Sequence, residues 1–122
     1  MAVSVTSQSN PYVDKLIVDT EANATAEANV LSGAATIYIV DIDNSNNTGS
    51  AAYAKLWNNT NPSVGTTEPD FILKAPKGVR QVVTVSAGSA FATGLSFACV
   101  TGAETANQTN PTNKVTIRVM AE

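Results

Sequence analysis

Short runs in which apolar and polar residues alternate recur along the whole chain, and turn-forming residues separate them. The run from Lys114 to Met120 alternates cleanly, with Val115, Ile117 and Val119 on one side and Thr116 and Arg118 on the other. A period of two residues is the period of a β-strand, because successive side chains point to opposite faces. This run therefore predicts a strand with one buried face.

Similar runs predict most of the other strands. Residues 36–43 are apolar on both faces in the middle, which is typical of a central strand, and Ala75–Gly78 is a tight turn that joins 71–74 to 79–86 in a hairpin. Further strands are expected at 12–20 and 95–101, and turns or loops at 44–50, 58–69, 88–94 and 102–113. The expected core comprises the inward apolar residues Ile37, Ile39, Phe97, Val115, Ile117 and Val119.

Two segments are ambiguous between helix and strand. Residues 21–32 are rich in Ala, but an Ala at every second position from Ala22 to Ala28 has the period of a strand. Residues 51–58 favour a helix by propensity, whereas a period of two places Tyr53, Lys55 and Trp57 on one face. We predict strands at both places; the second run is short for a helix and has turns close on both sides.

These elements add up to seven to nine short strands with turns about every ten residues, which favours an all-β fold. We predict a single-domain antiparallel β-sandwich, jelly-roll-like, over residues 12–122, preceded by an N-terminal arm at 1–11. The 122 residues are enough for one domain with a core of its own.

The composition limits the chemistry that the chain can perform. Charged residues are only 14% of the chain, against about 25% in a typical soluble domain. The chain has no His and one Cys, which excludes Cys/His zinc sites, Ser-His-Asp and Cys-His catalysis, His-ligated haem and an internal disulfide. We therefore expect a binding or structural protein without catalytic residues or cofactors, and not an enzyme.

Charge and hydropathy limit the classes of partner that the chain can bind. The net charge is −3, and the seven basic residues are scattered singly, so no nucleic-acid partner is expected. No apolar run approaches 18 residues and the first residues lack the pattern of a signal peptide, so we expect no membrane partner and synthesis in a cytoplasm. The lone Cys99 lies in an apolar run and is expected to be a small buried hydrophobic residue.

Two groups of polar residues are candidate ligand sites. Asp41, Asp43 and Asn44 resemble half of a calcium loop, but the later Gly and Glu of that motif are missing, so we expect a solvated strand end and no metal. Four Asn-x-Thr sequences and many Ser, Thr and Asn residues are interpreted as turn chemistry on a neutral surface. The alternative is that they bind a glycan through uncharged hydrogen bonds.

Four segments carry a resemblance to a known family. They are Ile42-Asp43-Asn44-Ser45-Asn46-Asn47, Tyr53-Ala54-Lys55-Leu56-Trp57-Asn58, the run from Pro62 to Phe71, and the run from Phe91 to Ala98. Together they resemble small virion proteins of tailed bacteriophages, including cyanophages and other marine phages. The resemblance covers residues 42–101 and implies a capsid decoration (cement) protein, or another head or tail accessory protein, with no catalytic residues.

We therefore expect a non-enzymatic virion protein on the outer surface of a phage capsid, where it stabilises the head by bridging capsid subunits. The expected partners are the major capsid protein and other copies of the chain, with a trimer favoured. An adhesin or carbohydrate-binding module of a tail or fibre is the alternative. The candidate interface residues lie in the arm, on one strand face and in the long loop, namely Val3, Val5, Pro11, Tyr53, Trp57, Pro62, Val64 and Pro69.

Overall fold

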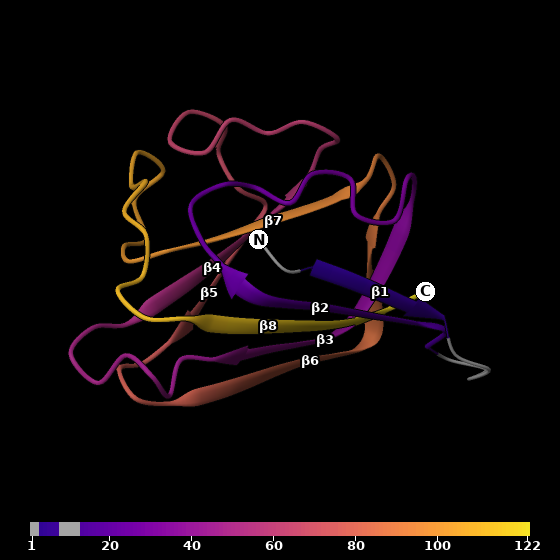
Figure 1. The fold of residues 1–122 in the computed structure, drawn as a ribbon. Coiled ribbons are helices and arrows are strands. Elements are labelled where there is room, and N and C mark those ends of the chain that lie inside the picture. Colours follow the sequence, from indigo (N-terminus) through magenta and orange to yellow (C-terminus); the bar gives the residue numbers. More distant parts are fainter. Residues whose placement is uncertain (1–2, 8–12) are drawn as a thin grey trace.

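The computed structural model describes residues 3–7 and 13–122, which form eight strands and no helix (Figure 1). A five-stranded antiparallel sheet has the order β1-β2-β8-β3-β6, and a three-stranded sheet has the order β5-β4-β7. The strands are β1 (Val3–Ser7), β2 (Lys15–Ala22), β3 (Ala35–Asp43), β4 (Ala52–Asn58), β5 (Phe71–Ala75), β6 (Arg80–Phe91), β7 (Leu95–Val100) and β8 (Val115–Ala121). The predicted all-β antiparallel sandwich is confirmed.

An irregular segment completes the smaller sheet. Residues 23–30 run antiparallel to β7, where the backbones of Glu27 and Phe97 exchange two hydrogen bonds of 2.8 and 3.1 Å. With this segment counted, the chain from β2 onward fills two four-membered layers, β2-β8-β3-β6 and 23–30-β7-β4-β5. This is the strand order of a jelly roll, to which β1 is added as an outer strand beside β2.

The strand prediction for 21–32 is largely wrong, whereas that for 51–58 is confirmed as β4. Beyond the end of β2 only Glu27 makes a strand-like bridge. The side chain of Asn23 accepts a hydrogen bond from the backbone of Thr25, and Asn29 and Ser32 adopt positive φ. Asn and Ser side chains compete with ladder hydrogen bonds, and the small Ala side chains offer little packing to oppose them.

The core lies between the two sheets. Of the six predicted core residues, five are at most 2% exposed, and Ile39 is the exception. A β-bulge between Ile37 and Ile39 shifts the register, so that Val40 and not Ile39 faces inward beside Val119. A bulge adds one residue and reverses the facing of every later side chain, so simple alternation assigned Ile39 to the wrong face.

The turn expected at 88–94 is partly wrong, because β6 runs through most of it. The β3–β6 register also shifts here, where Ile37 pairs with Ser89 and Ile39 with Thr84. The strand continues to Phe91, and Gly88 takes a φ of +77° within it. A Cβ at Gly88 would lie 2.7 Å from the Thr36 side chain and 2.9 Å from the Tyr38 ring, so Gly allows β3 and β6 to approach closely. The result is a 12-residue strand at one edge of the five-stranded sheet.

Candidate functional site

The outer side of the three-stranded sheet is buried under two loops. We call this side the covered face; it consists of Lys55, Trp57, Ser96, Ala98 and Val100, all at most 2% exposed. The loop 59–70 crosses Trp57, whose Nε1 donates to the carbonyl oxygen of Thr67 at 3.0 Å. The loop 101–113 covers Lys55, whose Nζ donates to the carbonyl oxygen of Glu104. The loops therefore add a third layer to this part of the sandwich (Figure 1).

Lys55 is the most unusual residue of the covered face. Its side chain is fully buried in the middle of β4, and burial lowers its pKa, an effect that the negative charge of Glu104 partly opposes. A backbone carbonyl is a neutral partner, so the ammonium group is held by a hydrogen bond and not by an ion pair. The hydrogen bond from Lys55 to Glu104 attaches the loop 101–113 to the sheet. Because Lys55 is fully buried, it is not available to a ligand from solvent.

The predicted interface residues on β4 and in the loop 59–70 differ in their exposure. Trp57 and Pro62 are buried within the chain, so their assignment to a partner surface is corrected: the loop that was expected to dock uses them to cover its own sheet. Val64 and Pro69 are half-buried in the same loop. Tyr53 is half-buried at the margin, with the Lys74 ammonium 6.0 Å from its ring centroid.

Asp41 and Asp43 share one face of β3, as predicted, on the outer side of the five-stranded sheet. Protein groups already bind both carboxylate oxygens of Asp41 and Oδ1 of Asp43. Arg80 donates to both carboxylate oxygens of Asp41, and Ser45 donates its hydroxyl and backbone N–H groups to Asp43 at 2.6 and 3.1 Å. The Ser45 bonds are the main reason that the pKa of Asp43 is lowered. In the described ranges 3–7 and 13–122, no group of three or more Cys, Asp or Glu residues could hold a metal ion.

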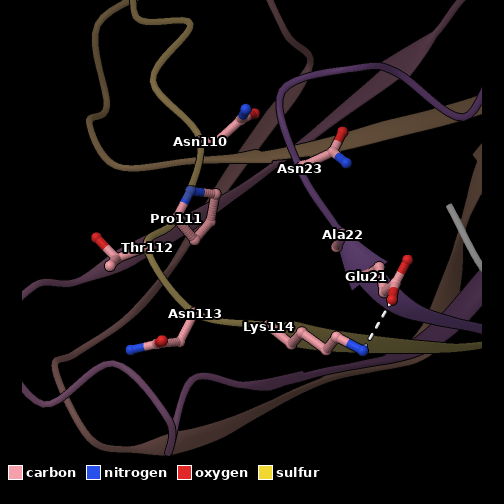
Figure 2. Close-up of a pocket in the computed structure, with 8 residues that line it drawn as sticks. All are labelled: Glu21, Ala22, Asn23, Asn110, Pro111, Thr112, Asn113 and Lys114. Atoms are coloured by element: carbon pink, nitrogen blue, oxygen red, sulfur yellow. Dashed lines mark ion pairs between the residues drawn. The ribbon is translucent and has the colours of Figure 1, made fainter.

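A shallow polar pocket of about 220 Å³ lies where β2 ends and β8 begins (Figure 2). Lys114 reaches along β8 to Glu21, with 2.8 Å between Nζ and the carboxylate oxygen, and this ion pair lowers the pKa of Glu21. Asn110 closes the other end, where its side chain accepts a hydrogen bond from the backbone of Ala24 at 2.9 Å. The other lining residues are Ala22, Asn23, Pro111, Thr112 and Asn113. Such uncharged hydrogen-bonding groups suit a polar neutral ligand.

Two buried groups are internal to the fold. Cys99 is fully buried and its pKa is raised to about 12, mainly by burial, which confirms it as a small core residue. Asp19 is 1% exposed on the inner side of β2; its Oδ1 accepts from the backbone of Glu21, whereas Oδ2 has no hydrogen-bond partner among the described residues. Burial raises the pKa of Asp19 and, together with the Asp19 charge, that of Glu27.

Exposed apolar side chains gather at strands that pair on one side only. Val3–Ser7, the described part of the predicted arm, forms β1 along β2 of its own chain, with both valines exposed. Pro11, the third candidate of the arm, lies outside the described residues. On the opposite side of the sandwich, Phe71 and Ile72 of β5 and Val82 of β6 are more than 40% exposed.

Sequence reasoning found the valines of β1 but missed the exposed residues of β5 and β6. The hairpin predicted for 71–74 and 79–86 is wrong, because β5 pairs with β4 and β6 pairs with β3, so the turn at 76–79 connects the two sheets. One signal was present, since Phe71-Ile72-Leu73 is apolar at successive positions and therefore on both faces of a short strand. That pattern is typical of a buried central strand, and only the pairing order shows that β5 is an edge.

No protein-family model, curated protein or solved structure matches this chain. Within the described part of the chain, no helix is long and apolar enough to cross a membrane.

Proposed function

We propose that this chain is a virion structural protein of a tailed phage that decorates the assembled capsid and stabilises it by bridging capsid subunits. The observation that carries the proposal is the placement of its exposed apolar residues. All six large hydrophobic side chains that are at least 36% exposed among the described residues lie on edge strands or in the turn between them, namely Val3, Val5, Phe71, Ile72, Val79 and Val82.

This placement supports adhesion through sheet edges. An edge strand offers unpaired backbone donors and acceptors, and a partner strand can satisfy them without any change to the core. Exposed apolar side chains beside those groups add contact area at the same place. The resemblance of residues 42–101 to small phage virion proteins suggests the partner, which is the major capsid protein on the outer surface of the head.

Repetition strengthens such a contact. A shell presents the same site many times, so a modest interface at each copy sums to a large effect when one molecule bridges two subunits. A low charge density suits close packing of identical subunits, because like charges would repel at every repeat.

The test uses heads assembled without this chain. Full-length protein and a variant lacking residues 2–10 are added to the heads, and occupancy is measured after sedimentation. Because every residue of β1 is exposed, the truncated domain should fold, and its circular dichroism and unfolding midpoint verify this. We expect the full-length protein to saturate the heads and raise their heat resistance, and the variant to bind much less. Equal occupancy would contradict a role of β1, and no binding by the intact protein would contradict the proposal.

A second function is favoured by the polar pocket at Glu21 and Lys114. Its Asn and Thr groups are the kind that hydrogen-bond sugar hydroxyls, which would suit an adhesin of a tail or fibre. Binding to a panel of cell-surface glycans distinguishes the two functions. Glycan binding that is lost in Asn110→Ala, together with no binding to heads, would favour the adhesin.

A further inference from the structure

The exposed apolar residues divide between two opposite sides of the sandwich. Val3 and Val5 are 36% and 43% exposed on β1, at one end of the sheet order. At the other end, Phe71 and Ile72 of β5 and Val82 of β6 are 41%, 42% and 48% exposed. One molecule therefore carries two separate apolar edges, and both belong to strands that have a neighbour on one side only.

The side formed by β5 and β6 has an opening into the core, which we call the seam. Here β5 pairs only with β4, and β6 only with β3, so both sheets end in a free strand. A cavity of about 120 Å³ lies between them, and its lining is entirely apolar: Ile37, Val40, Phe71, Leu73, Val83 and Val85. A strand added beside β6 would place its inward side chains over this seam.

The sequence of β1 matches such an acceptor. Val3 and Val5 occupy one face together with Ser7, and Ser4 and Thr6 occupy the other. Val3 and Val5 pair with Asp19 and Ile17, so they face the core side. Proteins commonly protect a free edge with Lys, Pro or an inward-pointing charge. Neither β1 nor residues 81–91 contain any charged residue or Pro.

The charges of the two sides are complementary. Residues 3–30 contain four acidic residues and one Lys, whereas residues 71–91 contain Lys74, Lys77, Arg80 and no acidic residue. Glu21 is paired with Lys114 and Arg80 with Asp41, and counting these two partners leaves a net charge of −2 on the first side and +2 on the second. Two copies that met through the same edge would bring like charges together, and two copies that met through different edges would bring opposite charges together. Electrostatics therefore favours head-to-tail association over a symmetric pairing of equal edges.

We infer that copies of this chain associate head to tail, with β1 of one copy lying along β6 of the next and Val3 and Val5 covering the seam. All neighbours in the five-stranded sheet are antiparallel, so β1 and β6 run in the same direction, and joined copies with their cores on one side form a parallel pair. Contacts of this kind close into a ring or continue as a filament, depending on the rotation between copies. The inference concerns the chain in solution and does not depend on a capsid.

The test is a complementation of two full-length variants. Val5→Lys disables the donor strand and keeps the acceptor, whereas Val83→Lys places a charge inward on β6 and keeps the donor. Ala106→Lys adds the same charge to an exposed residue of the loop 101–113 and is the control. Native mass spectrometry and sedimentation velocity measure the mass of each protein alone and of the equimolar mixture, and circular dichroism verifies folding.

We expect the wild type and Ala106→Lys to form oligomers that grow with concentration, each edge variant to be a monomer, and the mixture to form one-to-one heterodimers. A synthetic peptide of residues 2–9 should dissociate the wild-type oligomer, whereas a scrambled peptide should not; this arm does not depend on the folding of a variant. A monomeric wild type would overturn the inference and leave capsid binding to be judged by its own test. Loss of association by one variant only, with no complementation, would indicate symmetric pairing of equal edges and would also overturn it.

Discussion

The two sheets of this protein differ in what happens on their outer sides. On the covered face, polar and aromatic side chains such as Lys55 and Trp57 are at most 1% exposed, because two loops lie over them. On the outer side of the five-stranded sheet, which we call the open face, Leu16, Val18, Ile39, Met120 and Val82 face outward with no loop above them and remain half-buried or exposed. On the outer sides of the two sheets, burial is therefore decided by the covering loops, whereas alternation along the strands decides which residues face the core.

The comparison assigns the covered face to the stability of the fold, and the open face and free edges to contacts with partners. The covered face belongs to the interior, so changes there should mainly affect unfolding. The open face and the free edges are available to partners, so changes there should leave the fold nearly intact. Substitutions on the two sides, ordered by expected effect, can test this division.

The largest effect is expected for Trp57→Ala. The variant loses a buried aromatic side chain and leaves the carbonyl oxygen of Thr67 without its donor, which should cost about 3–5 kcal/mol. Urea unfolding measures the loss, with Val82→Ala on the open face as the control that should change little. A loss for Trp57→Ala as small as that of the control would mean that the loop 59–70 does not cover the sheet.

Ile37 and Ile39 provide a matched pair across the bulge. Ile37→Ala removes a core side chain and should cost about 2–5 kcal/mol, whereas Ile39→Ala on the open face should cost less than about 1.5 kcal/mol. Both values come from the same unfolding experiment. If Ile39→Ala cost as much as Ile37→Ala, the bulge would be misplaced.

Gly65 tests whether the two loops support each other. It has a φ of +93°, and an added Cβ would collide with the side chain of Gln108, which belongs to the loop 101–113. Gly65→Ala should therefore destabilise the protein by about 1–3 kcal/mol through backbone strain. Gly33→Ala, also at positive φ but with open space around the added carbon, separates strain from collision. Equal losses would show that the loops do not press on each other at this point.

Lys55 makes the covered face sensitive to pH. Burial lowers the pKa of Lys55 in the folded protein below the usual 10.5. At a pH between the folded-state pKa and 10.5, the unfolded chain therefore binds more protons than the folded one. The contribution of Lys55 to stability rises with pH across this range. The stability of Lys55→Met relative to wild type should therefore fall as pH increases from neutral toward 10.5. Unfolding midpoints across this range measure it, and a difference that does not change with pH would contradict burial of the ammonium group.

The smallest effect is expected from metal removal. The carboxylates of Asp41 and Asp43 on the open face are occupied by Arg80 and Ser45. EDTA should therefore leave the unfolding midpoint unchanged. A fall of several degrees that added Ca²⁺ reverses would identify these carboxylates as ligands.

Sequence patterns predicted the fold class, the final strand and most of the core, because period-two alternation survives wherever a strand is regular. They failed at Ile39, where a bulge reverses the facing, and at 21–32, where local Asn hydrogen bonds replace a ladder. Local patterns do not show which strands pair or where the loops lie. The exposure of Phe71 on an edge strand and the burial of Trp57 therefore followed only from the tertiary structure. Of the interface prediction, Val3 and Val5 remain as exposed candidates.

The central claim is that this domain binds its partners through its free edges. Hydrogen exchange of the chain, first kept dilute enough in solution to be monomeric and then bound to heads, measures this directly, because amides that gain a partner strand gain protection. We expect added protection at Val3–Ser7 and across residues 71–91, and unchanged exchange in the covering loops 59–70 and 101–113. Added protection confined to those loops, or to the polar pocket at Glu21 and Lys114, would contradict the claim.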